Sequence, residues 1–335
     1  MILLTGATGL VGSHILYTLV SRGEKVKATR RENSNVEEVR KLFRFYAGKE
    51  ADDLFNSVDW IYADLSDYGA LEEGLEGVNY VIHSAAKVSF NPREAQSMLR
   101  VNAEGTANLV NACLEKGVSK FCYVSSISSL GRHPEGKAVD EKVEWQPDDN
   151  RSAYSHSKFR AEMEVWRASK EGLPVIILNP SLVIGPIDWK RSSGRLFYSV
   201  RKGMPFYTTG ITGFVDVRDV SEAVVKLIHS DVVNERFILN GENLSFKDFF
   251  SMVAKSLDKR PPFFKATNWM TEIGWRANHL LCSIAGKVPA LTSDTARAAH
   301  SKAYYSNQKF SKAFNFQFRP IKEAVENAAQ WYSEN

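Results

Sequence analysis

A tyrosine and a lysine four positions apart are the residues best suited to chemistry. Tyr154 and Lys158 lie in a segment, 153–171, whose pattern predicts a helix. Residues at this spacing share one helix face, with Cβ atoms about 5–6 Å apart. A lysine ammonium beside a phenol favours the phenolate, so we expect Lys158 to lower the pKa of Tyr154. The tyrosine could then exchange a proton with a substrate oxygen near neutral pH.

A run of serines supplies a partner for this pair. Four serines (Ser125, Ser126, Ser128 and Ser129) follow or end an apolar run that predicts a strand over 120–125. Ligands of open α/β sheets bind at the carboxyl ends of the strands. A hydroxyl there can hydrogen-bond the reacting oxygen, and we take Ser126 as the third member of a Ser–Tyr–Lys set.

A glycine-rich turn lies near the start of the chain. The sequence TGATGLVG, residues 5–12, stands between an apolar run and a helical pattern. Glycines let the chain turn sharply and approach a pyrophosphate, and the helix that follows offers free N–H groups and a positive dipole end. The third glycine lets helix and sheet pack closely. We therefore predict a dinucleotide site whose first residues are Gly6, Thr8, Gly9, Leu10, Val11 and Gly12.

The end of the second predicted strand indicates which dinucleotide is bound. An NAD site normally places an acidic residue there, whereas arginine can pair with the 2′-phosphate of NADP. Arg30 and Arg31 occupy these positions. The sequence therefore favours NADP over NAD, and Asp64, just past the third strand, is a candidate for contacting the adenine.

Alternating strands and helices must position these residues. Apolar runs predict strands over 2–5, 25–29, 59–63, 80–83, 120–125 and 174–178, and helical patterns cover 10–22, 95–116 and 153–171. This alternation is typical of a Rossmann-type α/β fold with a doubly wound parallel sheet. We expect a cofactor domain over 1–185, with 214–240 returning to it. Residues 186–213 and 241–335 form a smaller, mostly helical substrate domain. A strand and helix over 214–229 should return to the main sheet.

Composition excludes several other classes of protein. The 335 residues are 44% hydrophobic and 24% charged with a formal net charge of +4, and no basic cluster indicates nucleic-acid binding. Three scattered cysteines and the absence of metal-ligand spacings predict neither disulfides nor a metal site. No signal peptide or membrane span is apparent, so we expect a cytoplasmic protein. The segment 269–285 is expected to be a packing helix or a lid.

Together these motifs resemble the extended short-chain dehydrogenase/reductase family, which is also called the NAD-dependent epimerase/dehydratase family. The sequence VIHSAA, residues 81–86, is similar to its fourth-strand segment along the cofactor, so Ala85, Ala86 and Lys87 would contact it. Asn102 resembles the family's active-site asparagine, and the resemblance implies that it relays protons or positions Lys158. The resemblance also implies that Lys158 and Tyr154 contact the nicotinamide half, and that helices 95–116 and 153–171 form a homodimer interface.

Two segments point to one branch of this family. Residues 178–186 (LNPSLVIGP) and 214–220 (FVDVRDV) are similar to dihydroflavonol reductase-like and 3β-hydroxysteroid dehydrogenase-like proteins. Sugar-nucleotide epimerases usually carry an Arg-Asp pair where this chain has Thr212-Gly213. The branch implies further cofactor contacts from Leu65, Pro180 and Val183.

The function expected from these features is reversible reduction of a ketone or aldehyde on a small hydrophobic substrate, with Tyr154 as acid and base. Two alternatives stay open at this point. One is a nucleotide-sugar epimerase or dehydratase with tightly bound NAD, and the other is an NADP-sensing protein without turnover. The candidate pocket residues are Lys87, Val88, Phe90, Ser128, Ile184, Phe197 and Tyr207.

Overall fold

The computed structural model describes residues 1–89, 91–133, 136–146, 151–284 and 292–334, and its centre is a seven-stranded sheet. The strands run parallel in the order β10-β6-β5-β4-β1-β2-β3. Their bounds are β1 (Ile2–Thr5), β2 (Val26–Arg30), β3 (Asp59–Tyr62), β4 (Tyr80–His83), β5 (Lys120–Val124), β6 (Val175–Pro180) and β10 (Glu235–Leu239). The predicted doubly wound α/β fold is confirmed, and each of the six predicted strands lies within two residues of its expected bounds.

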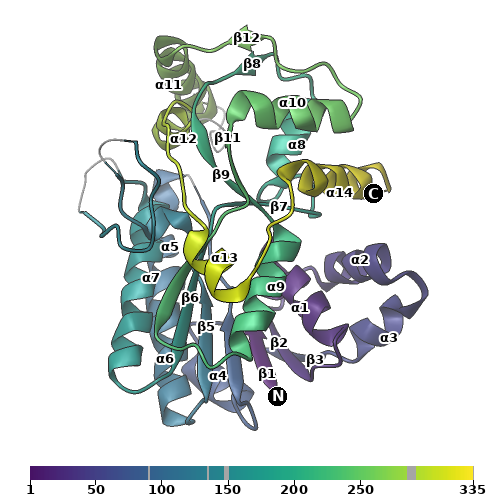
Figure 1. Ribbon diagram of the computed structural model, residues 1–335, viewed down its shortest axis with the longest axis vertical. Helices are drawn as coiled ribbons and strands as arrows, with labels where there is room; N and C mark the ends of the chain where they lie inside the picture. The colour runs from purple at the N-terminus through teal and green to yellow at the C-terminus, as the bar shows by residue number, and fades with distance from the viewer. Residues whose placement is uncertain (90, 134–135, 147–150, 285–291, 335) are drawn as a thin grey trace.

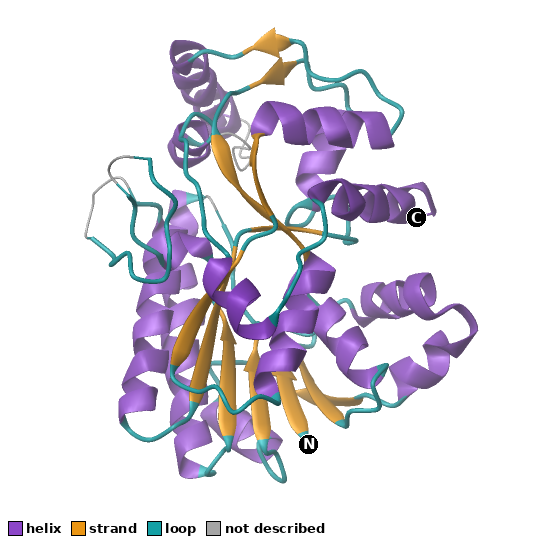
Figure 2. Ribbon diagram, viewed as in Figure 1, coloured by secondary structure: helices purple, strands orange, loops and turns teal. Residues whose placement is uncertain are grey.

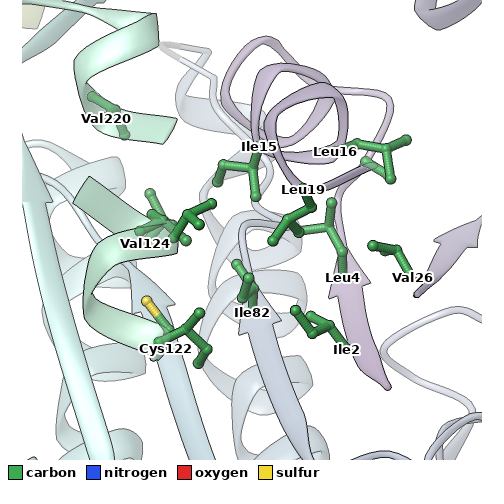
Figure 3. Close-up of a cluster of buried hydrophobic side chains, with 14 of the residues drawn as sticks. Ile2, Leu4, Ile15, Leu16, Leu19, Val26, Ile82, Cys122, Val124 and Val220 are labelled. Atoms are coloured by element: carbon green, nitrogen blue, oxygen red, sulfur yellow. The ribbon is translucent and has the colours of Figure 1, made fainter. Parts of the chain in front are cut away.

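Helices cover both faces of this sheet (Figures 1 and 2). One face carries α1 (Leu10–Val20), α2 (Val36–Ala47), α3 (Ala51–Asn56) and α9 (Val217–Ile228), and the other carries α4 (Tyr68–Gly74), α5 (Ala95–Leu99), α6 (Gly105–Glu115) and α7 (Ala153–Lys170). Successive side chains of a strand point to opposite faces. Ile2 and Leu4 of β1 therefore enter the cluster with α1 (Figure 3), whereas Leu3 enters the cluster below α6 and α7.

The helix predicted over 95–116 is interrupted. Between α5 and α6 the residues Arg100–Glu104 form a turn of π-helix, and Asn102 lies within it, buried. Such turns shift the register of a helix and are frequent at functional sites. The prediction of a helix over 95–116 is confirmed apart from this π-helical turn, which the sequence did not indicate because a single wide turn hardly disturbs the apolar spacing on either side of it.

A second region follows β6 at the carboxyl ends of the main strands. It contains a three-stranded sheet of β7 (Leu182–Ile184), β9 (Ile211–Asp216) and β11 (Glu242–Ser245), and a short parallel pair of β8 (Phe206–Tyr207) and β12 (Phe264–Lys265). Its helices are α8 (Gly194–Arg201), α10 (Phe246–Ser256), α11 (Asn268–Ile284), α12 (Ser293–Ala298) and α14 (Ile321–Glu334), and α13 (Gln308–Phe314) packs back beside β10. Phe197, Phe214, Phe249 and Trp331 are at the centre of its own core.

The expectation for 214–229 was right for the helix and wrong for the strand. The helix α9 packs beside α1 on the main sheet, whereas β9 pairs with β7 and β11 in the smaller sheet. Asp216 ends β9 and caps α9 by accepting a hydrogen bond from Arg218 N, so the chain changes region at this residue. The strand that joins the main sheet is β10, beside β6.

The described residues contain neither a membrane-spanning helix nor a group of metal ligands. Their helices include none that is long and apolar enough to cross a membrane. Within the same residues no three His, Cys, Asp or Glu side chains are grouped as metal ligands. The helix predicted over 269–285 is α11, and Ala285 lies outside the described residues.

Candidate active site

The glycine turn joins β1 to α1 and leaves room that only glycine can leave. Gly6 has a φ of +74°, and a Cβ on it would lie 2.5 Å from Ala85 N. A Cβ on Gly12 would lie 2.1 Å from Gly6 O. Gly9 precedes α1 without a side-chain cap, so the first N–H groups of the helix stay available to an anion, with Thr8, Leu10 and Val11 around them. The turn therefore fits a dinucleotide pyrophosphate.

Charged residues gather at the carboxyl ends of β2 and β3. The Arg30 guanidinium lies 4.2 Å from the centre of the Tyr62 ring, and Arg30 Nη2 donates to the Tyr62 hydroxyl at 2.5 Å. Arg31 is exposed in the loop that follows. Asp64 Oδ1 accepts hydrogen bonds from Ser66 N and Ser66 Oγ, which lower the pKa of Asp64. Both arginines thus stand where the dinucleotide's ribose is expected, and their role stays a prediction.

Asn102 ties the segment after β4 to the helix that carries Tyr154. Its Oδ1 accepts from Lys87 N at 2.7 Å, and its Nδ2 donates to Lys87 O and Ser157 Oγ, both at 2.9 Å. The chain through Ala85, Ala86 and Lys87 is therefore fixed against α7. Asn102 contacts Ser157, the residue before Lys158, so any effect on Lys158 passes through the helix.

Another residue near the glycine turn is held just as firmly. The buried His83 ring lies between the hydroxyls of Thr5, at 2.6 Å from Nδ1, and Thr106, at 2.9 Å from Nε2. Burial, reinforced by the positive charge of Lys158, lowers the pKa of His83 to about 3. A neutral imidazole therefore links β1, β4 and α6 directly beneath the site.

Ser126 and Tyr154 meet at the end of β5. Tyr154 lies in the first turn of α7, which Ser152 caps by accepting from Ser155 N. Burial raises the pKa of Tyr154, and a hydrogen bond with the Ser126 side chain partly offsets this rise. Ser126 Oγ also accepts from Ser128 N at 3.1 Å, which fixes the serine in place.

Lys158 lies one helical turn beyond Tyr154 and is buried. Its Nζ donates to Val124 O at 2.9 Å and lies 4.6 Å from the centre of the Tyr123 ring. Burial lowers the pKa of Lys158 to about 7, against the opposing effect of Glu162. The expectation that Lys158 lowers the pKa of Tyr154 was wrong for this structure, because desolvation dominates at both groups and raises the pKa of the tyrosine.

A buried carboxylate that sequence reasoning missed organises the serines. Glu162 Oε2 accepts from Ser125 Oγ at 2.8 Å, Ser129 Oγ at 2.5 Å and Asn179 Nδ2 at 3.2 Å. Its Oε1 forms an ion pair with Arg236 of β10. Ser125 and Ser129 are thereby held by Glu162, whereas Ser126 is the serine whose side chain hydrogen-bonds Tyr154. The sequence feature that could have identified Glu162 is its spacing, since it follows Lys158 by four residues on the same helix face.

The candidate pocket residues divide into separate environments. Ile184 and Phe197 are fully buried in the core of the second region, so they pack rather than line a pocket. Val88 is 56% exposed near Lys87, and Tyr207 lies on β8 below Lys247. Phe90 lies outside the described residues. Pro180 ends β6 and Val183 lies in β7, both at the sheet edge that faces the site.

A Rossmann-type sheet with a glycine turn and a Ser–Tyr–Lys set defines a class of enzymes that use nicotinamide dinucleotides. The family model for the NAD-dependent epimerase/dehydratase family matches residues 2–239. The chain belongs to this family and has the extended short-chain dehydrogenase/reductase fold, as its sequence motifs predicted.

Similar proteins support an oxidoreductase. A putative dihydroflavonol 4-reductase of Synechocystis sp. is 26% identical over 99% of this chain and 94% of its own length. Cinnamoyl-CoA reductase 1 of Petunia hybrida is 25% identical over 97% of this chain and 90% of its own length. The crystal structure of gox2253 superposes with a TM-score of 0.81, at 31% identity over 100% of this chain and 98% of the other. The protein is an NAD(P)-dependent oxidoreductase.

Proposed function

We propose that the protein reduces a ketone or aldehyde on a small hydrophobic substrate, in a reversible reaction with NADPH. The observation that carries this proposal is the Ser126–Tyr154 contact at the carboxyl end of β5, with Lys158 one helical turn away. The two similar proteins named above are reductases, which supports the same reaction direction.

Each side chain has its own role in the proposed reaction. A bound reduced nicotinamide supplies the hydride for the carbonyl carbon. Ser126 Oγ and the Tyr154 hydroxyl hold the carbonyl oxygen, where negative charge develops, and Tyr154 gives this oxygen its proton. The product is an alcohol. Lys158 would contact the ribose, and the Gly6–Gly12 turn would hold the pyrophosphate. The raised pKa of Tyr154 keeps the phenol protonated and ready to donate at neutral pH.

The preference for NADPH rests on Arg30 and Arg31. Arg30 is stacked on Tyr62, which presents a planar guanidinium at the end of β2, and Arg31 follows it in an exposed position. A guanidinium can bind a phosphate through two parallel hydrogen bonds. We expect NADPH to bind more tightly than NADH for this reason.

The experiment begins with an absorbance spectrum of the purified protein, which shows whether a nicotinamide dinucleotide is already bound. Calorimetric titrations with NADPH and NADH follow, and then turnover on a panel of ketones and aldehydes. An empty protein that prefers NADPH supports the reductase. Protein that carries bound NAD, or that prefers NADH, favours the epimerase or dehydratase reading, whose name the family also bears.

Replacing Tyr154 by phenylalanine tests the proton donor. Tyr154→Phe should lower kcat by about 100-fold or more, since proton transfer contributes about that much, while cofactor affinity changes little. Tyr198→Phe, which alters an exposed tyrosine on α8, is the control and should behave as the unaltered protein. Full turnover in Tyr154→Phe would exclude the mechanism, and NADPH binding without any turnover by the unaltered protein would favour a sensing role.

A further inference from the structure

The strands β8 and β12 and the helix α11 form the far end of the second region (Figure 1). These elements and the residues next to them carry exposed aromatic side chains. The exposed fractions are 46% for Phe206, 64% for Phe263, 55% for Phe264, 65% for Trp269 and 59% for Ile273. We call these five residues the aromatic patch. They make up five of the eleven exposed large apolar side chains among the described residues, so apolar exposure is concentrated here. Concentrated exposure of this kind marks an interaction site.

The backbone holds the phenylalanines outward. In the parallel pair of β8 and β12, Phe264 lies opposite Phe206, and their ring centres are 6.0 Å apart. The N–H groups of Phe263 and Phe264 both donate to Pro205 O at 2.9 Å. The Phe263 and Phe264 rings are 4.4 Å apart. These side chains therefore form a fixed apolar surface rather than a loop that could fold inward.

The helix α11 extends this surface. Trp269 and Ile273 are four residues apart and share one helix face. Thr271 points the other way, toward the body of the molecule, where its hydroxyl lies 2.9 Å from His300 Nε2. The first turns of α11 thus present apolar side chains to the solvent, which is the reverse of a helix that only packs on its own core.

Positive charge flanks the aromatic patch. The stretch 255–265 holds Lys255, Lys259, Arg260 and Lys265 against a single acidic residue, Asp258, so its net charge is four minus one, or +3. Lys259 and Arg260 precede Phe263, and Lys265 follows Phe264, and all three are exposed. In the described part of the chain no carboxylate forms an ion pair with these three. Aromatic side chains beside unpaired lysines and arginines are typical of surfaces that lie on anionic membranes.

We propose that the aromatic patch docks this enzyme on the surface of an anionic phospholipid bilayer. The rings would enter the boundary between headgroups and acyl chains, and Lys259, Arg260 and Lys265 would face the lipid phosphates. A second copy of the chain suits the patch less well. A two-fold interface would bring the basic residues of both copies to one site, where their like charges repel. The inference is independent of the reaction proposed above.

Vesicle binding tests this proposal with the full chain. The protein is sedimented with vesicles of phosphatidylcholine alone and with vesicles of equal parts phosphatidylcholine and phosphatidylglycerol. We expect binding to the anionic vesicles that weakens about tenfold or more at high salt, as screened charge attraction requires. Trp269 fluorescence should shift to the blue on binding, and the shift should be absent in Trp269→Phe.

Two variants and their matched controls separate the parts of the patch. Phe263→Ser combined with Phe264→Ser, and Lys259→Glu combined with Arg260→Glu, should each lose about tenfold or more in vesicle affinity. Val233→Ser, at another exposed apolar residue, and Lys25→Glu combined with Lys49→Glu should bind as the unaltered protein. The proposal is overturned by equal binding to both kinds of vesicle, by no binding, or by unchanged binding of the patch variants. Self-association that the serine substitutions abolish would assign the patch to a second copy instead.

Discussion

Lys158 shows how much the surroundings of one residue change its chemistry. The YxxxK spacing predicts that the Lys158 ammonium lowers the pKa of Tyr154. In the structure burial disfavours the charged form of each group, so it raises the pKa of Tyr154 and lowers that of Lys158. Glu162 opposes this effect at Lys158 and is itself held by Arg236. The electrostatics at the end of β5 therefore depend on a fully buried carboxylate.

Replacing Glu162 by glutamine should lower the free energy of unfolding. Glu162→Gln leaves Arg236 without its ion-pair partner and removes the effect that raises the pKa of Lys158. Breaking one side of a buried pair costs about 3–5 kcal/mol, and we expect the lower part of this range because Arg236 is partly exposed. Urea unfolding measures the loss of stability. The pH profile of turnover should move to lower pH, because the pKa of Lys158 falls further without the Glu162 charge.

The control lies on the same helix. Glu164→Gln disturbs an exposed pair with Arg167 and should cost about 1 kcal/mol or less. Equal stability of the two glutamine variants would contradict a structural role for Glu162.

His83 should make stability depend on pH. Its folded pKa is about 3, below the ordinary value of 6.5, so between these values the unfolded chain binds more protons. Stability therefore falls as pH drops through this window, by at most about 1.4 kcal/mol per pH unit from this residue. In His83→Asn the amide can still contact both threonines and does not titrate. The contribution of residue 83 to the slope of stability against pH should therefore vanish.

The comparison between variants isolates His83 from the other titrating groups. His14, with a pKa lowered to about 4, adds to the same slope, and Asp219, with a pKa raised to about 6, opposes it. Both remain in His83→Asn. Urea unfolding at several pH values measures the slopes, and His156→Asn, at an exposed position, should match the unaltered protein. An unchanged slope in His83→Asn would show that this buried histidine does not control acid stability.

Among the elements, long periodic segments could be predicted and short mixed ones could not. The buried strand VIILNP and the glycine turn are recognisable because parallel strands are apolar throughout and the turn excludes a Cβ. The smaller sheet of β7, β9 and β11 was missed because its strands are short and their burial follows no simple alternation. The sequence pointed to Ser126 among four serines, and its role stays a prediction. The contacts of Glu162 with Ser125 and Ser129 could not be foreseen, since a charged residue on a helix usually faces water.

A further prediction concerns Asn102 in the π-helical turn. Asn102→Asp can still accept from Lys87 N but can no longer donate to Lys87 O and Ser157 Oγ. Stability should fall by about 1–3 kcal/mol, and NADPH affinity should weaken because the segment after β4 loses its anchor. Calorimetry and urea unfolding measure both effects. Asn111→Asp, on α6, keeps its acceptor for Arg167 and should be neutral. Unaltered affinity in Asn102→Asp would mean that Ala85–Lys87 is fixed by other contacts.

At the scale of the whole molecule, α6 and α7 form the flank that we expect to pair with a second copy. Met163 of α7 is 39% exposed on this flank. Burying its side chain in a two-fold interface would remove apolar surface from water on both subunits.

Sedimentation velocity tests this expectation. The unaltered protein should sediment as a dimer, and Met163→Arg should shift it to the monomer by placing like charges across the interface. Val233→Arg, at an exposed residue between α9 and β10, should remain a dimer. A monomeric unaltered protein would rule out the interface and leave the proposed chemistry intact.

The ion pair between Glu162 and Arg236 also sets an order of events during synthesis. Glu162 leaves the ribosome after the first five strands of the chain, whereas Arg236 arrives on β10, after four further strands and two helices. Until then the nascent chain holds a buried carboxylate whose cation has not been made, and the cost of that unpaired charge opposes closure of the core around it. The serines that follow β5 would therefore reach their final arrangement late, as β10 docks beside β6.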